Sequence, residues 1–179
     1  MSILIRPSAD ADLPAMTAIY AHAVRMGTAT FELEPPNEED MGRRHADVVA
    51  RGLPWLCAID RSRGDRVAGY AYAAPFRPRP AYRFTVEDSI YVDGERQGFG
   101  IGRLLLAELA MRCVAWGARQ MVAVIGDGDP ASVALHRRLG FRASGTLSAV
   151  GWKHGAWRDV ALMQRALGYG GTPIGPEMP

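Results

Sequence analysis

A glycine-rich turn between a strand and a helix constrains the fold of this 179-residue chain more than any other feature. The segment Gln97-Gly98-Phe99-Gly100-Ile101-Gly102 follows an apolar stretch that ends at Val92 and precedes an apolar helix that runs to Trp116. Glycine lacks a Cβ, so its amide can approach a ligand closely and adopt positive φ. Successive amides at a helix N-terminus bind phosphate with support from the helix dipole. The turn therefore predicts an anion site in a fold that mixes strands and helices.

Two common phosphate-binding loops are excluded by the residues around this turn. A dinucleotide fingerprint needs a third glycine where the chain has Arg103, and a P-loop needs a Gly-Lys-Ser/Thr sequence that the chain lacks. A short glycine motif alone is a weak indication, and a turn without a ligand is an equally good interpretation. The surrounding elements decide between these two interpretations.

Apolar periodicity and turn residues predict one α/β (α+β) domain over residues 1–167. Its sheet is expected to be mixed, mostly antiparallel and about seven-stranded, flanked by about four helices. The Gly- and Pro-rich residues 168–179 are expected to form a flexible tail. The expected strands are 3–6, 55–60, 67–74, 84–92, 120–125, 141–150 and 157–164. The expected helices are 10–27, 37–51, 104–116 with a start near Ile101, and 129–140.

Composition narrows the class of protein. With 21 basic and 19 acidic residues, the net charge of +2 is too balanced for a dedicated nucleic-acid-binding protein. No apolar run approaches the roughly 18 residues of a membrane helix, and the N-terminus lacks a signal-peptide core. A soluble cytoplasmic protein is therefore expected. Cys57 and Cys113 lie in apolar segments without metal-ligand spacing, so we expect reduced core thiols and no metal.

The elements around the turn carry a family resemblance. Gln97-x-x-Gly100-x-Gly102, after a strand and before a helix, resembles the acetyl-CoA pyrophosphate loop of the GNAT N-acetyltransferase superfamily. Residues 129–141 resemble its second cofactor motif, and the element order agrees with its fold from residue 3 to about 167. The resemblance implies acetyl-CoA as cosubstrate, with strand backbone groups pairing with its pantetheine amides. The implied cofactor-binding residues are Ile90, Tyr91, Val92, Gln97, Gly98, Phe99, Gly100, Ile101, Gly102, Asp129, Ser132 and His136.

Three further segments resemble one branch of that superfamily. Residues 28–35, 82–92 and 151–159 are similar to the phosphinothricin and methionine sulfoximine acetyltransferases. This resemblance implies a small amino-acid-like acceptor. It also implies a homodimer, with the hairpin around residues 151–159 at the pocket rim and the dimer interface.

Glu87 is the candidate general base. A primary amine titrates between about 8 and 10 and is mostly protonated at neutral pH, so a carboxylate must accept its proton. Glu87 lies in an otherwise apolar strand, where burial would raise its pKa. From the residues alone, a solvent-facing glutamate is the alternative, and the resemblance places the family's catalytic glutamate at this position. Asp88 should face the opposite side of a regular strand and is a secondary candidate.

His136 stands where many GNAT enzymes have a tyrosine that protonates the departing thiolate. Its ordinary pKa near ~6.5 suits a proton donor, and a half-buried helix histidine without a proton role is equally open. Asp129 precedes Pro130, so helix capping is favoured over the pantetheine contact that an asparagine makes in many relatives. Ser132 either contacts the cofactor or is an ordinary residue of the first helical turn.

The segment from Phe76 to Arg83 is the candidate acceptor loop. Pro78 and Pro80 bias the arginines before them toward extended conformations, and guanidinium groups pair with carboxylate or phosphinate. An exposed basic loop is the alternative interpretation. The predicted substrate-binding residues are Phe31, Arg77, Arg79, Tyr82, Thr85, Val86 and Glu87.

Together these patterns predict an N-acetyltransferase that acts on the α-amino group of a small amino-acid analogue. The leading candidates are methionine sulfoximine, methionine sulfone and phosphinothricin. Neither cysteine has a nucleophile setting, so direct attack in a ternary complex is expected. A peptide or protein N-terminal acetyltransferase and a non-catalytic acyl-CoA sensor remain alternatives.

Overall fold

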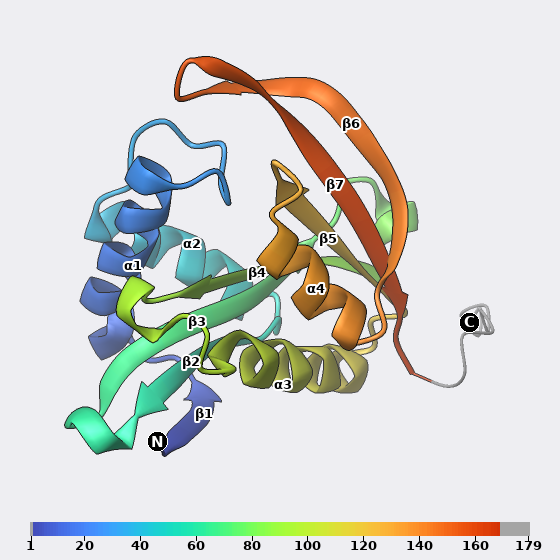
Figure 1. Ribbon diagram of the computed structural model, residues 1–179. Helices are drawn as coiled ribbons and strands as arrows, with labels where there is room; N and C mark the ends of the chain where they lie inside the picture. The colour runs from blue at the N-terminus through green and yellow to red at the C-terminus, as the bar shows by residue number, and fades with distance from the viewer. Residues whose placement is uncertain (1, 169–179) are drawn as a thin grey trace.

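The computed structural model describes residues 2–168, which form one seven-stranded sheet with helices on both faces (Figure 1). The strands are β1 (Ile3–Pro7), β2 (Trp55–Asp60), β3 (Arg66–Pro75), β4 (Thr85–Val92), β5 (Gln120–Gly126), β6 (Arg142–Lys153) and β7 (Ala156–Ala166). The helices are α1 (Leu13–Met26), α2 (Glu38–Ala50), α3 (Ile101–Trp116) and α4 (Pro130–Arg138). The predicted elements are thus confirmed, with differences of a few residues at their ends.

The sheet has the order β1-β2-β3-β4-β5-β7-β6. Its one parallel pair joins β4 to β5, and the other neighbours described here run antiparallel. The predicted mixed, mostly antiparallel α/β (α+β) sheet of seven strands with four helices is confirmed. Within residues 2–168, no helix is long and apolar enough to cross a membrane. The tail predicted for residues 168–179 lies outside the described residues, except for Gly168.

Helix ends follow the capping residues of the sequence. The Asn37 side chain accepts a hydrogen bond from the Asp40 amide at 2.8 Å and starts α2. The Asp129 side chain does the same for the Ser132 amide at 2.7 Å and starts α4, so the predicted capping role is confirmed. Helices α1 and α2 lie on one face of the sheet, and α3 and α4 lie on the other (Figure 1).

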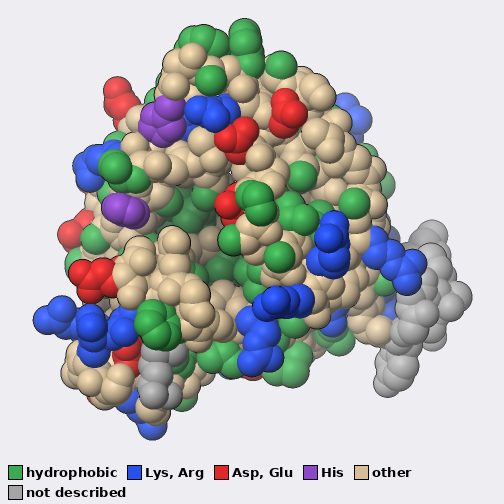
Figure 2. All heavy atoms as spheres, viewed as in Figure 1, with side chains coloured by type: hydrophobic (Ala, Val, Ile, Leu, Met, Phe, Trp, Pro, Cys, Tyr) green, Lys and Arg blue, Asp and Glu red, His purple; other side chains and the backbone are tan. Residues whose placement is uncertain are grey.

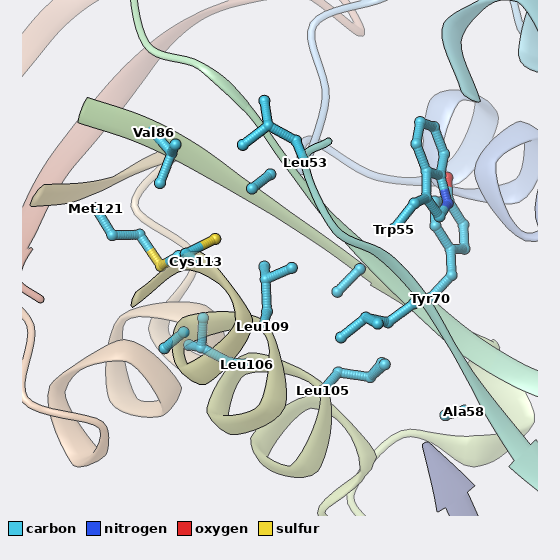
Figure 3. Packing of buried hydrophobic residues seen from close by; sticks show 14 of the residues in the cluster. Leu53, Trp55, Ala58, Tyr70, Val86, Leu105, Leu106, Leu109, Cys113 and Met121 are labelled. Atoms are coloured by element: carbon cyan, nitrogen blue, oxygen red, sulfur yellow. The ribbon is translucent and has the colours of Figure 1, made fainter. Parts of the chain in front are cut away.

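The core extends over both faces of the sheet, and one part of it lies between α3 and the central strands. Figure 3 shows Leu105, Leu106 and Leu109 of α3 near the sheet, and all three side chains are fully buried. Cys113, one turn further along, is buried as a free thiol, as predicted. Val114, the next residue, is 43% exposed. One residue advances a helix by about 100°, so the position after Cys113 turns away from the sheet.

Strands β4 and β5 separate part of the way along their length. They are paired from Thr85–Gln120 to Asp88–Ala123, where the recorded pairing between them ends. The opposite edge of β4 continues to pair with β3 as far as Val92. The backbone edge of β4 beyond Asp88 therefore faces an opening in the sheet, and this opening positions the candidate site.

Candidate active site

The predicted phosphate-binding turn has the geometry of an anion cradle. Gly98 and Gly100 adopt left-handed φ values of 79° and 78°, and Gly100 is the N-cap of α3. A Cβ at either position would meet no atom within 4 Å, so the space above the turn is open. The free amides and the positive dipole end of α3 are therefore available to an anionic ligand.

A groove of about 770 Å³ runs from this turn between α1, β4 and α4. Three arginines from its lining, Arg96, Arg103 and Arg138, add positive charge. Figure 2 shows the hollowed face of the molecule, with Lys and Arg side chains gathered below and to the right of the hollow. The predicted cofactor residues found in this lining are Ile90, Tyr91, Val92, Gln97, Gly98, Gly100, Ile101, Gly102, Asp129 and Ser132.

Two predicted cofactor residues lie elsewhere. Phe99 is 58% exposed and absent from the groove lining, with its ring 6.0 Å from the Arg96 guanidinium carbon. Left-handed glycines on both sides turn its side chain outward. His136 lines the neighbouring cavity and not the groove.

An ion pair that the sequence analysis missed anchors the turn. The Arg96 guanidinium lies 2.8 Å from Asp60 Oδ2 at the end of β2. Hydrogen bonds from Ser62, together with the charge of Arg96, lower the pKa of Asp60. Arg96 therefore ties the turn to the sheet, in addition to lining the groove.

A second cavity of about 340 Å³ opens where β4 and β5 separate. Of the predicted catalytic and substrate residues, Phe31, Glu87 and His136 line it. Three tyrosines that the sequence analysis did not assign to the acceptor pocket also line it: Tyr20, Tyr72 and Tyr91. Tyr20 donates a hydrogen bond to Glu32 at 3.0 Å and its ring contacts Tyr91, which fixes the aromatic wall. Alternating tyrosines at positions 70 and 72 are the sequence signal that could have indicated this wall.

Glu87 is half-buried in the cavity wall. Burial raises the pKa of Glu87 above its ordinary value, the charge of Arg77 opposes this shift, and the neighbouring Asp88 adds to it. A carboxyl group with a raised pKa is a stronger proton acceptor once it is ionised. The arrangement is suited to taking a proton from an amine in the cavity.

Phe31 is positioned by two glycines from other elements. A Cβ at Gly126 or Gly151 would press against the Phe31 ring, and one at Gly126 would also overlap the carbonyl oxygen of Thr28. The buried Lys153 amine donates to the Thr30 carbonyl oxygen at 2.6 Å, so the β6–β7 hairpin holds this loop from the other side. Phe31 is therefore held in place by packing from β5 and the hairpin.

The predicted acceptor loop does not line the cavity. Arg77 and Arg79 are exposed, and the Arg77 guanidinium lies over the Phe76 ring and donates to the Phe76 carbonyl oxygen. Tyr82 is 41% exposed and packs on Phe76 outside the lining. This loop turns outward before β4 begins, which explains its separation from the cavity.

Two predicted substrate residues on β4 are also outside the cavity lining. Thr85 lies at the start of the strand, where β4 is still paired with β5. Val86 has an exposed fraction of 0% and lies in the core. The side chain of Val86, a residue predicted to bind substrate, therefore packs in the core and does not line the cavity.

Asp88 and His136 form a buried pair beside the cavity. His136 Nε2 lies 2.9 Å from Asp88 Oδ2, and His136 Nδ1 lies 2.7 Å from the Ser132 carbonyl oxygen. Burial lowers the pKa of His136, but the hydrogen bond and charge of Asp88 raise it more, so the net shift is upward. Both ring nitrogens face oxygen acceptors. This geometry argues against the prediction that His136 protonates a thiolate directly, since both N–H groups of an imidazolium would already be used.

Within residues 2–168, no group of three or more His, Cys, Asp or Glu side chains is arranged to hold a metal ion.

The sequence profile of the GNAT acetyltransferase family matches residues 16–141. The phosphinothricin N-acetyltransferase of Alcaligenes faecalis is 49% identical over 174 residues, which are 97% of this chain and 86% of that protein. The L-methionine sulfoximine/L-methionine sulfone acetyltransferase of Pseudomonas paraeruginosa is 44% identical over 170 residues, 93% of this chain and 96% of that protein.

A solved structure resembles the whole fold. It is the crystal structure of a GNAT superfamily phosphinothricin acetyltransferase from Sinorhizobium meliloti in complex with AcCoA, 50% identical with a TM-score of 0.91. The match covers 95% of this chain and 91% of that one. The sequence prediction of the family, the fold and an N-acetyltransferase is confirmed, and the chain belongs to the GNAT family of acetyltransferases.

Proposed function

We propose that this enzyme uses acetyl-CoA to acetylate the α-amino group of a small amino-acid analogue, with Glu87 as general base. The supporting observation is the position of Glu87 in a cavity of about 340 Å³ that adjoins the glycine-turn groove. The cavity and the groove share lining residues on β4 and α4. An amine in the cavity and a thioester in the groove can therefore meet at one place.

The donor is proposed to bind along the groove. The pyrophosphate group would accept hydrogen bonds from the amides at Gly98 to Gly102 at the N-terminus of α3. The backbone edge of β4 at Ile90 and Val92 is free of pairing with β5, so it can bind the pantetheine amides as an added strand would. Backbone groups would thus make the main contacts with acetyl-CoA in the groove, and the arginines of the groove lining would add positive charge.

Glu87 is proposed to accept the proton of the ammonium group, directly or through a water molecule. The raised pKa of Glu87, caused mainly by burial, makes its carboxylate a better acceptor at neutral pH. The free amine would then attack the acetyl carbon in a ternary complex. Cys57 and Cys113 are both buried, and burial raises the pKa of each thiol to about 12, which does not favour a covalent acetyl-enzyme.

The acceptor is proposed to be an amino acid analogue with an anionic or strongly polar side chain. Relatives at 49% and 44% identity are named for phosphinothricin and for methionine sulfoximine and sulfone. The charge of Arg77 is close enough to lower the pKa of Glu87, so it would also attract an anionic acceptor toward the cavity. Arg77 would act at longer range than in direct pairing, because it lies outside the cavity lining.

A homodimer through the β6–β7 hairpin is proposed as the working assembly. Strand β6 is an edge of the sheet, and Val150, Trp152 and Trp157 on the hairpin are each more than half exposed. An exposed apolar edge of this kind is a ready surface for a second copy of the chain. Light scattering of the full chain measures the assembly, and a monomer at all concentrations would contradict it.

The function is tested by measuring CoA release from acetyl-CoA with a panel of acceptors. The panel contains phosphinothricin, methionine sulfoximine, methionine sulfone, a set of peptides and a blank without acceptor. We expect release that depends on the three amino-acid analogues. Release confined to peptides would indicate an N-terminal acetyltransferase. Acetyl-CoA binding without release for any acceptor would indicate an acyl-CoA sensor and would contradict the proposal.

A further inference from the structure

Five residues line both the groove and the cavity and so mark the place where the two meet. The proposed function puts the thioester there, with the acetyl group toward Glu87 and the sulfur toward the groove. The departing sulfur is a thiolate, which a nearby proton donor would stabilise. The residues at this junction are Ala29, Ile90, Tyr91, Asp129 and Ser132.

Two of these five residues have a side-chain hydroxyl group. The Tyr91 ring packs against Tyr20 at 4.9 Å and against Tyr70 at 5.3 Å, and burial raises its pKa well above the ordinary value. The groups recorded around it are other tyrosines, so a proton given up by Tyr91 would not be replaced by a more acidic neighbour. The Asp129 carboxylate is an acceptor and is used to cap α4. Ser132 is the remaining hydroxyl group at the junction.

A histidine and a carboxylate lie behind Ser132. Ser132 Oγ is 3.4 Å from His136 Nδ1, and the same nitrogen is 2.7 Å from the Ser132 carbonyl oxygen. On the other side of the ring, Nε2 is 2.9 Å from Asp88 Oδ2. His136 and Asp88 are 4% and 7% exposed. The three side chains form a line from the junction into the interior, in the order hydroxyl, imidazole and carboxylate.

The ionisable groups around the histidine favour the imidazolium form. Asp88 on β4 is the acidic group in contact with it, and Glu87 on the same strand faces the cavity. On α3, Cys113 lies near Asp88, and burial raises the pKa of Cys113 to about 12, so it stays a neutral thiol. The opposing effects of burial and Asp88 leave the pKa of His136 raised. The hydrogen bond and charge of Asp88 thus favour the protonated ring.

We propose that the Ser132 hydroxyl is the group that protonates the departing CoA sulfur, and that His136 and Asp88 are positioning residues that supply its proton. As the carbon–sulfur bond breaks, the sulfur takes the hydrogen of the Ser132 hydroxyl. Ser132 Oγ takes the Nδ1 proton of His136, which becomes a neutral imidazole with Nε2–H directed at Asp88. One proton has then moved from the imidazolium to the thiol. The ring regains a proton from solvent, and Glu87 releases the proton that it took from the amine.

The 3.4 Å separation between Ser132 Oγ and Nδ1 is longer than an ideal hydrogen bond. Catalytic hydrogen bonds are often long without substrate and shorten in the reacting complex. In this arrangement His136 takes part in proton transfer although both of its ring nitrogens already have oxygen partners. The sequence predicted that His136 protonates the departing sulfur directly. In this proposal Ser132 makes that contact and His136 supplies the proton.

The first test compares Ser132→Ala with Ser132→Thr, which keeps the hydroxyl at the same backbone position. We expect Ser132→Ala to lower kcat on the order of 10²-fold, the lower end for a positioned proton donor, and Ser132→Thr to restore most of it. The acceptor KM should change little in both variants. If wild-type enzyme releases no CoA with any acceptor, the proposed function fails. If it turns over and Ser132→Ala is as fast, only the Ser132 proposal fails.

The second test needs no turnover. The product CoA is titrated in complex with each variant, and the thiolate is followed by its ultraviolet absorbance. A hydroxyl that donates to the sulfur stabilises the thiolate, so the thiol pKa of CoA bound to wild type should fall below that of free CoA titrated in the same buffer. It should rise again by roughly one unit in Ser132→Ala. An equal thiol pKa in wild type, Ser132→Ala and Ser132→Thr would overturn the proposal.

The positioning role of Asp88 is tested with Asp88→Asn. Asparagine fills the same space but removes the charge, so the imidazolium loses its counter-ion. We expect the His136 ring protons, followed by NMR, to titrate at lower pH and the acid side of the kcat profile to change with them. A His136 titration that is unchanged in Asp88→Asn would remove Asp88 from the proposal.

Discussion

The groove and the cavity of this enzyme are built in different ways. The groove is lined by residues from three stretches of the chain, 19–29, 90–103 and 129–138, and its anion-binding part uses backbone amides of one continuous turn at the N-terminus of α3. The cavity uses side chains from α1, the loop at residues 29–31, four strands and α4. A site built from backbone groups depends mainly on the conformation of the chain. A site built from side chains depends directly on which residues are present. This difference predicts separate effects on the donor and on the acceptor.

The largest effect is expected at Glu87. Glu87→Gln keeps the shape of the side chain but removes the proton acceptor, and kcat should fall about 10³-fold, within the range for general base catalysis. The KM for acetyl-CoA should stay the same, because Glu87 lies in the cavity and outside the groove lining. Steady-state kinetics with both substrates varied measures the two effects.

The matched control is Glu39→Gln on α2. The Glu39 side chain is 82% exposed, pairs with Arg43 and is outside the linings of the groove and the cavity. This variant should keep wild-type kcat. Turnover in Glu87→Gln equal to that of the control would remove Glu87 as the base and would contradict the division into donor and acceptor halves.

The next effect tests the backbone character of the groove. Alanine at Gly100 would have to adopt φ near 78°, which costs roughly 1–2 kcal/mol, or move the amides of the turn. The KM for acetyl-CoA should therefore rise roughly tenfold, with a small effect on the acceptor KM. The measurement is the affinity for acetyl-CoA by calorimetry, combined with initial rates.

Gly64→Ala provides the control for backbone strain. Gly64 has a φ of 70° and open space around its Cβ position, as Gly100 does, but it lies in the β2–β3 connection outside the groove. It should lower the stability of the protein without changing acetyl-CoA affinity. Equal loss of affinity in both variants would show that general strain, and not the turn amides, explains the effect.

The groove and the cavity also differ in how far the sequence predicted their residues. The turn from Gln97 to Gly102 could be identified because its residues are contiguous, and the Asp129 cap could be identified because capping is local. Phe99 was predicted to bind the cofactor, but its side chain is exposed and outside the groove lining, and the motif alone does not show this direction. Local rules therefore predicted the backbone path well and one side-chain direction poorly.

The cavity could be predicted only in part. Glu87 and Phe31, which the family-like segments singled out, line the cavity, whereas Arg77 and Arg79, predicted to bind the acceptor, lie outside its lining. The contact between Asp88 and His136 joins residues 48 positions apart in sequence, and no local pattern specifies such a pair. Tertiary packing determines which side chains meet, so the predicted elements were correct while much of this wall was missed.

A smaller effect is expected from the packing of Phe31. Alanine at Gly151 would overlap the Phe31 ring and displace it, so the acceptor KM should rise roughly fivefold, corresponding to about 1 kcal/mol of overpacking. The acetyl-CoA KM should stay near wild type. The double variant Phe31→Ala with Gly151→Ala removes the clash, so the effects of the two changes should not be additive. Additive effects in this cycle would exclude the Phe31 contact as the cause.

The smallest effect is expected from the charge of Arg77. This charge lowers the pKa of Glu87 and partly offsets the upward shift caused by burial. Arg77→Ala removes the offset, so the pKa of Glu87 should rise and the acid side of the kcat/KM profile should move to higher pH. Activity should consequently be lost mainly below the pH optimum and recovered above it, because the base must be ionised to act.

Arg79→Ala is the control, since Arg79 is an exposed neighbour that does not shift the pKa of Glu87. If the two variants give the same profile, the field of Arg77 does not reach the cavity. If Arg77→Ala instead raises the acceptor KM at every pH, Arg77 pairs with the acceptor, and the acceptor half would extend beyond the cavity into the loop before β4.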